Sequence, residues 1–159
     1  VSEHMLRAAR TARPQSSHVV AADLGQGLGF RKGVFDGAIS ISAVQWLCHA
    51  TQPGHDPDKR VRKFFVGLHA VLAGGARAVL QFYPEQPEHV EMLRAAAVKA
   101  GFAGGLVVDY PWSERSKKLF LVLLKAKHSA PPAPDGVAAA APKPSNKGGG
   151  GKGGKGGKG

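Results

Sequence analysis

Two short polar segments, each placed directly after a predicted strand, have the residue types needed to bind a nucleoside. The first, Asp23 to Gly27, reads Asp-Leu-Gly-Gln-Gly and follows the apolar run from His18 to Ala22. In open α/β sheets, ligands bind outside the carboxyl ends of the strands. There the Asp23 carboxylate could accept a hydrogen bond from an exocyclic amine such as that of adenine, and the next backbone amide could donate to a ring nitrogen. A plain turn is the alternative, because Asp and Gly are common turn residues.

The second segment, Ser42 to Trp46, follows a predicted strand over residues 37–41. The amide of Gln45 could hydrogen-bond to a base, and the indole of Trp46 could stack on one. The alternative is that Trp46 belongs to the core of the following helix. The segment differs from the Asn/Asp-Pro-Pro-aromatic loop associated with methylation of exocyclic amines, which argues against an amine substrate of that kind.

The remaining reactive residue types indicate neither a catalytic group nor a metal site. Cys48 is the single cysteine, so a disulfide framework within the chain is excluded, and we expect Cys48 to be a small buried residue. His49, His55 and His69 do not have the spacing of metal ligands. No residue is therefore assigned as catalytic or metal-binding.

Charge and composition divide the chain into two parts. Lys and Arg number 22 against 11 Asp and Glu, a net charge of +11 over 159 residues. Residues 128–159 are rich in Pro and Ala and then in Gly and Lys, cannot bury a core, and are predicted to be a disordered tail after a folded part at residues 1–127. A basic cluster at residues 59–63 is either a solvated helix face or a phosphate-contacting patch. The longest apolar run, Leu119 to Leu124, is far shorter than a membrane span, so no membrane partner is expected.

Apolar periodicity predicts alternating helices and strands. Helices are predicted over residues 2–13, from a cap at Asp58 to a stop at Gly74-Gly75, and from Pro87 to Gly101. Strands are predicted over residues 18–22, 37–41, 76–83, 105–110 and 118–124. This alternation indicates an α/β fold with a mostly parallel sheet, in which the closely spaced last two strands form a hairpin, so one of them is antiparallel.

The stretch from Phe35 to Cys48 resembles the eukaryotic small-subunit ribosomal RNA guanine-N(7) methyltransferases, most specifically between Ile39 and Leu47. Four further stretches match the same family: residues 23–27, 77–85, 100–111 and 117–121. The resemblance implies the Rossmann-like fold of the class I methyltransferases and S-adenosylmethionine as cofactor. It implies a sheet of strand order 3-2-1-4-5-7-6, with strand 7 antiparallel.

The resemblance also assigns roles to single residues. Asp23 would contact the adenine amine and Leu24 the adenine ring, while Ser42 would lie beside the methionine end of the cofactor. Three residues would lie against the target guanine: Ala43, Gln45 and Trp46. Because the guanine ring nitrogen already carries a lone pair, catalysis would consist mostly of positioning for in-line transfer, without a strong base.

The start of the chain matches the family just after strand 2, so the resemblance implies a partial sheet that lacks its first two strands and the Gly-rich turn that binds the donor. Strand 3, at residues 19–22, would then have no neighbour, and strand 4, at residues 38–41, would be an unpaired edge. We therefore expect the chain to be inactive alone. The alternative is a non-catalytic RNA-binding or assembly factor derived from the methyltransferase fold.

The resemblance finally implies partners and a cellular location. The partners would be 18S ribosomal RNA in the pre-40S particle and a small zinc-binding activator subunit that pairs along the edge of strand 3. The location would be the nucleus, in particular the nucleolus, with the cytoplasm as an additional compartment.

Overall fold

The computed structural model describes residues 2–12, 17–113 and 117–127. Its elements are, in chain order, α1 (Glu3–Ala12), the 3-10 helix η1 (Leu24–Gln26), β1 (Phe35–Ile41), the 3-10 helix η2 (Val44–Cys48), α2 (Pro57–Val71), β2 (Leu72–Phe82), α3 (Pro87–Lys99), β3 (Phe102–Asp109) and β4 (Lys118–Lys125). The predicted tail at residues 128–159 lies outside the described residues, so the boundary at residue 127 stays a prediction.

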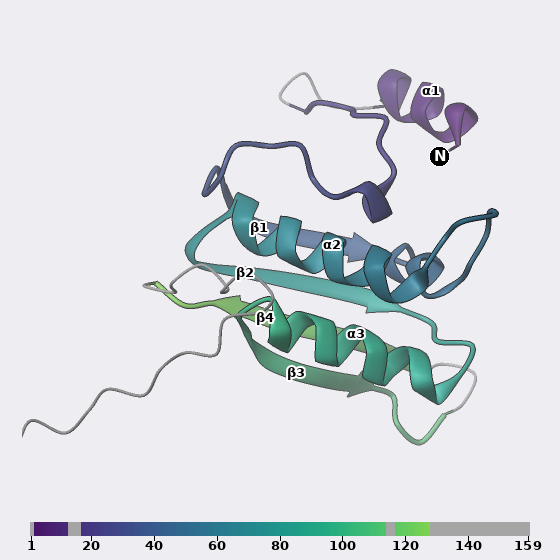
Figure 1. Ribbon diagram of the computed structural model, residues 1–159, viewed down its shortest axis with the longest axis vertical. Helices are drawn as coiled ribbons and strands as arrows, with labels where there is room; N and C mark the ends of the chain where they lie inside the picture. The colour runs from purple at the N-terminus through teal and green to yellow at the C-terminus, as the bar shows by residue number, and fades with distance from the viewer. Residues whose placement is uncertain (1, 13–16, 114–116, 128–159) are drawn as a thin grey trace, which may run out of the picture.

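The strands form one four-stranded sheet of order β1-β2-β4-β3 (Figure 1). β1 pairs with β2 in parallel, whereas β4 is antiparallel to both β2 and β3. This arrangement confirms the predicted α/β class and the antiparallel last strand. It also means that β1, β2 and β3 run in the same direction and end at one edge of the sheet, which we call the carboxyl edge.

Helices α2 and α3 cover one face of the sheet (Figure 1). The predicted apolar spacing of α2 places Phe64, Phe65 and Leu68 on a single side of the helix, and all three are buried. They belong to the same core cluster as Leu80 and Phe82 of β2. Full burial of each such side chain contributes roughly 1.5–3 kcal/mol, so this layer is the main source of stability.

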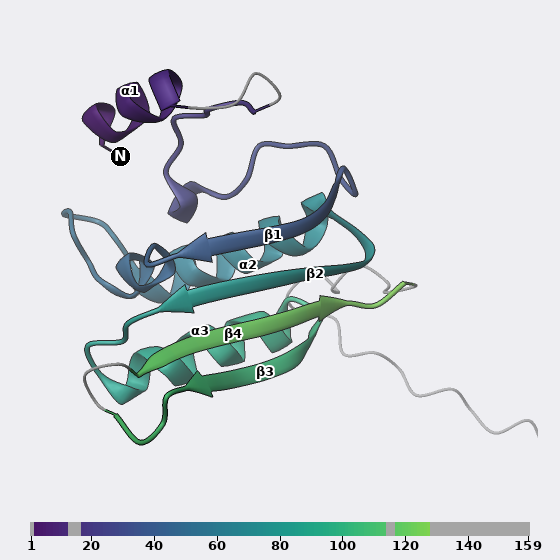
Figure 2. The ribbon, with the colours of Figure 1, turned by 180° about the vertical axis from the view of Figure 1, so that it is seen from behind.

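The opposite face of the sheet is apolar as well. Side chains alternate between the two faces of a strand, and the residues facing away from α2 and α3 include Ile39, Ile41, Val107 and Leu124, all of which are exposed. Figure 2 shows this face of the sheet, over which none of the described helices lies. Sheets with parallel strands are normally covered on both faces, so this surface favours self-association.

We expect the chain to self-associate in solution and Ile39→Lys to weaken that association. The Ile39 side chain is 81% exposed on the edge strand β1, so a lysine there places charge on the apolar face at little cost to folding. Sedimentation velocity over a range of protein concentrations measures the effect. Val98→Lys, at an exposed apolar position on α3, is the matched control and should leave association unchanged. A wild-type chain that stays monomeric at every concentration would contradict this prediction.

Three predicted features differ from the structure. Residues 18–22 form no strand, because no other described strand lies beside them to accept their backbone hydrogen bonds. α2 is capped by Asp56 rather than Asp58, since Asp56 Oδ1 accepts from the Lys59 amide at 3.1 Å and Pro57 occupies the first helical turn. The helix ends before Gly74-Gly75, because Leu72 already has extended backbone and pairs with Phe35 of β1.

A buried histidine at the end of α2 makes stability depend on pH. His69 packs edge-on against Phe102, with ring centroids 5.0 Å apart, and burial, followed by the charge of Lys125, lowers the pKa of its imidazole. In the unfolded chain the imidazole takes up a proton near pH 6.5, whereas the buried ring stays neutral. The unfolded state therefore binds more protons just below that pH, and stability falls as the solution is acidified.

We accordingly expect the free energy of unfolding to decrease between about pH 7 and pH 5, and His69→Gln to flatten this decrease. Urea unfolding at a series of pH values measures it. His4→Gln, at an exposed position on α1, should keep the wild-type slope. An equally steep slope in His69→Gln would show that other groups cause the pH dependence.

Candidate functional site

The two segments predicted to bind a nucleoside lie at the same edge of the sheet. Ser42 directly follows β1, and its amide donates to the Gln81 carbonyl of β2 at 3.0 Å. Asp23 caps η1, which lies beside the carboxyl end of β1 in both views (Figures 1 and 2). Arg60, near the start of α2, reaches across to Asp23. Both segments therefore lie toward the carboxyl edge, Ser42 at the end of β1 and Asp23 against the start of α2.

The turn that follows Asp23 is clamped by Arg60. Asp23 Oδ1 accepts hydrogen bonds from the Gly25 amide and from Arg60 Nη2, both at 2.9 Å, and Oδ2 accepts from Arg60 Nη1 at 3.0 Å. The Arg60 guanidinium, aided by the Gly25 amide, holds the pKa of the Asp23 carboxyl below its usual value although burial opposes this. A side chain at Gly25 would collide with the guanidinium. The sequence placed Arg60 in a basic cluster and offered no sign of this partner, which is 37 residues from Asp23.

This turn keeps room for an adenine amine. An ionised carboxylate offers about four lone-pair sites, and the three bonds to Asp23 leave capacity on Oδ2. The Asp23 side chain is 34% exposed, so that capacity faces accessible space. Leu24 packs partly against the core and would offer only part of its side chain to a ring. The residues present therefore fit the predicted adenine contact at Asp23, and the contact itself stays a prediction.

Ser42 is held in an unusual conformation. Its φ of 51° lies in the left-handed region, which residues with a side chain rarely adopt and which often marks functional sites. Its hydroxyl donates to Oε1 of the buried Gln81 at 2.9 Å, in addition to the backbone bond to the same residue. Gln81 therefore positions Ser42. Gln81 lies in the stretch at residues 77–85 that matches the family, and no role was predicted for it.

The predicted guanine-contacting residues differ in exposure, because the short helix η2 turns one side toward the core. Val44, Leu47 and Cys48 lie on that side and are buried, while Trp46 is 58% exposed. The alternative that Trp46 is a core residue is therefore wrong. Gln45, in contrast, is buried, and its Oε1 has no hydrogen-bond partner among the described residues. Ala43 precedes η2 and is partly buried.

A histidine pair that the sequence analysis did not predict lies next to η2. The rings of His49 and His89 meet edge-on, with centroids 4.8 Å apart, and His49 Nε2 is 3.7 Å from Glu85 Oε1. In the part of the chain that the structure describes, His49 Nε2 and His89 Nδ1 are buried and have no hydrogen-bond partner. With Gln45 Oε1, they leave unmet hydrogen-bonding capacity at this edge, and such buried atoms are rare in folded proteins.

Known proteins of one family are similar to most of this chain. A probable 18S rRNA (guanine-N(7))-methyltransferase of Dictyostelium discoideum is 47% identical over 137 residues, which are 86% of this chain and 47% of that protein. The 18S rRNA (guanine-N(7))-methyltransferase of Arabidopsis thaliana is 51% identical over 77% of this chain and 42% of its own length. Over most of its length the chain is therefore similar to part of the 18S rRNA (guanine-N(7))-methyltransferases. The predicted resemblance is thus confirmed, and the chain spans somewhat less than half the length of these relatives. No protein-family model matches the chain.

The fold agrees with this family. A S-adenosylmethionine-dependent methyltransferase of Methanosarcina mazei superimposes with a TM-score of 0.54 over 80% of both chains, at 14% identity. Together with the mixed sheet, this match confirms the class I methyltransferase fold. The family's predicted cofactor would therefore lie at the carboxyl edge, where Asp23, Leu24 and Ser42 are found.

Cys48 has the surroundings of a structural cysteine rather than those of a nucleophile. It is buried in the core, and burial, with a smaller effect of the Asp58 charge, raises the pKa of its thiol to about 11. The reactive thiolate is therefore scarce at neutral pH. Cys48 is the small buried residue that the sequence analysis expected.

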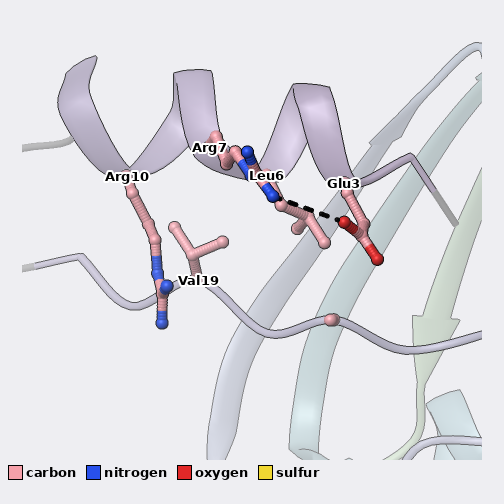
Figure 3. A pocket seen from close by; sticks show the side chains of 6 residues that line it. Glu3, Leu6, Arg7, Arg10 and Val19 are labelled. Atoms are coloured by element: carbon pink, nitrogen blue, oxygen red, sulfur yellow. Dashed lines mark ion pairs between the residues drawn. The ribbon is translucent and has the colours of Figure 1, made fainter.

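A cavity lies away from these residues, between α1 and the segment after it (Figure 3). It measures about 230 Å³, below the usual size of ligand pockets, and none of the predicted site residues lines it. Its lining residues are Glu3, Leu6, Arg7, Arg10, Val19 and Ala21.

The described residues contain neither a cluster of metal ligands nor a membrane-spanning helix. None of their His, Cys, Asp and Glu side chains gather in threes as metal ligands would. Among the helices in the same residues, none has the length and apolar character needed to cross a membrane.

Proposed function

We propose that this chain is part of an S-adenosylmethionine-dependent methyltransferase that modifies N7 of a guanine in the 18S ribosomal RNA of the pre-40S particle. The observation that carries the proposal is the identity of 47% and 51% to relatives that bear this name. The placement of Asp23 and Ser42 at one edge supports it, because the two ends of a sulfonium nucleoside need contacts from neighbouring loops. A non-catalytic RNA-binding or assembly factor is less favoured, since these relatives are named as enzymes.

In this proposal the residues of the chain bind and orient the reactants. S-adenosylmethionine supplies a methyl group bound to a positively charged sulfur. Asp23 Oδ2 would accept a hydrogen bond from the adenine amine, and Leu24 would contact the adenine ring. Ser42 would lie beside the methionine end of the cofactor. The guanine N7 lone pair would accept this methyl group as the sulfur–carbon bond of the donor is released, so the chain would need no base to remove a proton. Orientation for in-line transfer is then the main contribution of the protein.

The target guanine would be held by η2. Trp46, which is exposed, offers a face for stacking on the base. Gln45 and Ala43 lie in the same segment, and Gln45 Oε1 could accept from the guanine amine after a small rearrangement that exposes it.

A chimeric enzyme tests this function. Residues 19–127 of this chain would replace the matching segment of the Arabidopsis thaliana relative, and transfer of a labelled methyl group to 18S ribosomal RNA would be measured, with N7-methylguanine located by chemical strand cleavage. We expect a methylating chimera whose activity falls at least tenfold on Asp23→Ala. A folded chimera that binds the donor and leaves guanine N7 unmodified would overturn the proposal.

We also propose, from the family resemblance, a small zinc-binding activator subunit as partner and the nucleus, in particular the nucleolus, as location. The segment at residues 18–22 supports the partner, since it is extended, carries an exposed Val20, and pairs with no described strand. Val20→Pro, which removes a backbone donor, should weaken capture of the purified activator of a family member, whereas Val20→Thr should not. Equal capture by both variants would contradict pairing at this segment.

A fluorescent fusion of the chain tests the location.

A further inference from the structure

Four exposed aromatic side chains follow the ends of the three strands that run in the same direction. Trp46 follows β1, Tyr83 follows β2, and Tyr110 and Trp112 follow β3, with exposed fractions from 47% to 82%. We propose that these four residues, the aromatic row, bind an unpaired segment of RNA whose bases stack on the rings. The inference rests on the proposed function, to which it adds the path of the RNA beyond the target guanine.

The strand register places the strand ends that the row follows close to one another along the carboxyl edge. Phe82, just before Tyr83, pairs with Leu119 of β4, and Leu119 pairs in turn with Val108 of β3. Adjacent strands lie about 4.8 Å apart, so the ends of β2 and β3 are separated by roughly 10 Å. Strand ends this close can all be reached by one unpaired RNA strand.

Contacts also join the row to the predicted guanine-contacting segment. Trp46 and His49 have ring centroids 6.2 Å apart, and His49 in turn approaches Glu85, two residues after Tyr83. The RNA path can therefore begin at Trp46 and continue over the end of β2 toward β3.

The turn after β3 holds its two rings in the exposed position. Tyr110 has a φ of 50°, in the left-handed region, and its amide donates to Asp109 Oδ1 at 3.0 Å. The Ser113 amide donates to the Tyr110 carbonyl at 3.1 Å and closes the turn. The Tyr110 and Trp112 rings meet at 70° with centroids 5.9 Å apart. A strained backbone that presents two large rings to solvent points to a ligand for those rings.

The chemistry of the edge favours a nucleic acid strand. Every base has an apolar face that stacks on aromatic rings, which makes such rows tolerant of sequence. Lys118, exposed at the start of β4 on the same edge, supplies a charge for a phosphate, whereas Glu85 and Asp109 partly offset it. The net charge of +11 favours the approach of a polyanion. Because acids are interspersed, stacking rather than ion pairing should provide most of the affinity.

Intrinsic fluorescence tests the row directly, because the chain has two tryptophans, Trp46 and Trp112. In the full chain carrying Trp46→Phe, Trp112 is the only indole. We expect a single-stranded RNA of twelve nucleotides to quench it on binding, and a hairpin duplex of equal length to do so at least tenfold more weakly. Stacking of one base on an aromatic ring corresponds to about tenfold in affinity.

Variants in the otherwise wild-type chain then separate stacking from other effects, with RNA affinity measured by fluorescence anisotropy. Trp112→Leu, which keeps an apolar side chain, should weaken binding about tenfold, and Trp112→Tyr should restore it to within threefold. Phe30→Leu, which removes an exposed ring before β1 at the opposite edge, should leave affinity unchanged. Thermal unfolding confirms that each variant is folded.

The outcomes distinguish this inference from the proposed function. Absence of quenching at Trp112, or equal RNA affinity of the wild type and Trp112→Leu, overturns the aromatic row even if the chimera methylates guanine. Quenching of Trp112 together with an inactive chimera supports the row and overturns the methyltransferase proposal. Equal binding of single strand and duplex would show recognition of phosphates rather than stacking, and would also overturn the row.

Discussion

Arg60→Ala is expected to lower the free energy of unfolding by about 2 kcal/mol at pH 7 and to release the turn at Asp23. The guanidinium makes two hydrogen bonds of 2.9 and 3.0 Å to the Asp23 carboxylate, and its side chain is 12% exposed. Removing it leaves a partly buried carboxylate with fewer partners. This loss of stability is small for two hydrogen bonds between charged groups, because the Asp23 side chain is 34% exposed and water screens the pair.

The acid dependence of this effect follows from the pKa of Asp23, which the Arg60 hydrogen bond lowers. A carboxyl whose pKa is lower in the folded state stabilises the protein above the pKa of the unfolded chain, near 3.9, and loses that contribution as the pH falls through its folded value. The difference between wild type and Arg60→Ala should therefore shrink below about pH 4. Urea unfolding at pH 7 and pH 3 measures it.

Arg94→Ala is the matched control. Arg94 forms the same two-bonded pair with Glu91, at 2.8 and 3.0 Å, but on the exposed surface of α3. Its loss should change stability much less than the loss of Arg60, because solvent screens exposed ion pairs. Equal losses of stability in the two variants would show that the Arg60–Asp23 pair contributes no more than an exposed ion pair. In the chimeric enzyme, Arg60→Ala should also raise the KM for the donor, since the adenine-contacting turn is no longer held.

Gly104→Ala is expected to have the largest effect on stability, about 4 kcal/mol of destabilisation. Gly104 lies in β3 with a φ of 124°, a conformation that other residues rarely adopt. An added Cβ would also meet the Val122 carbonyl oxygen of β4, a backbone atom that cannot move without breaking the ladder. The strain of the backbone and the collision act together.

Gly105→Ala provides the control in the same strand. Nothing lies within 4 Å of a Cβ at Gly105, and its φ is outside the left-handed region, so stability should change by less than about 1 kcal/mol. Thermal and urea unfolding of the two variants give the comparison. Similar stability of Gly104→Ala and the wild type would contradict the close approach of β3 and β4 at this position.

Much of the fold could be predicted from local patterns. The apolar spacing in residues 61–71 indicated α2 and its buried side, and Pro87 and Gly101 marked the ends of α3. The short separation of the last two strands indicated the antiparallel β4. These predictions were correct because helix periodicity, capping and hairpin formation depend on residues close together in the chain. The strand predicted at residues 18–22 was wrong, because a strand also needs a neighbour that local pattern does not reveal.

The candidate site also combines features that depend on local sequence with features that depend on tertiary contacts. Local motifs located Asp23 and Ser42 after apolar segments. Ser42 does follow a strand, whereas the strand predicted before Asp23 is absent, and the roles of both residues stay predictions. The residues that hold them, Arg60 and Gln81, lie 37 and 39 positions away and emerged only in three dimensions. Periodicity states which face of an element is buried, but not which distant side chain that face will meet. Partners of this kind, and the exposure of Trp46, result from how α2 and the strands pack on one another.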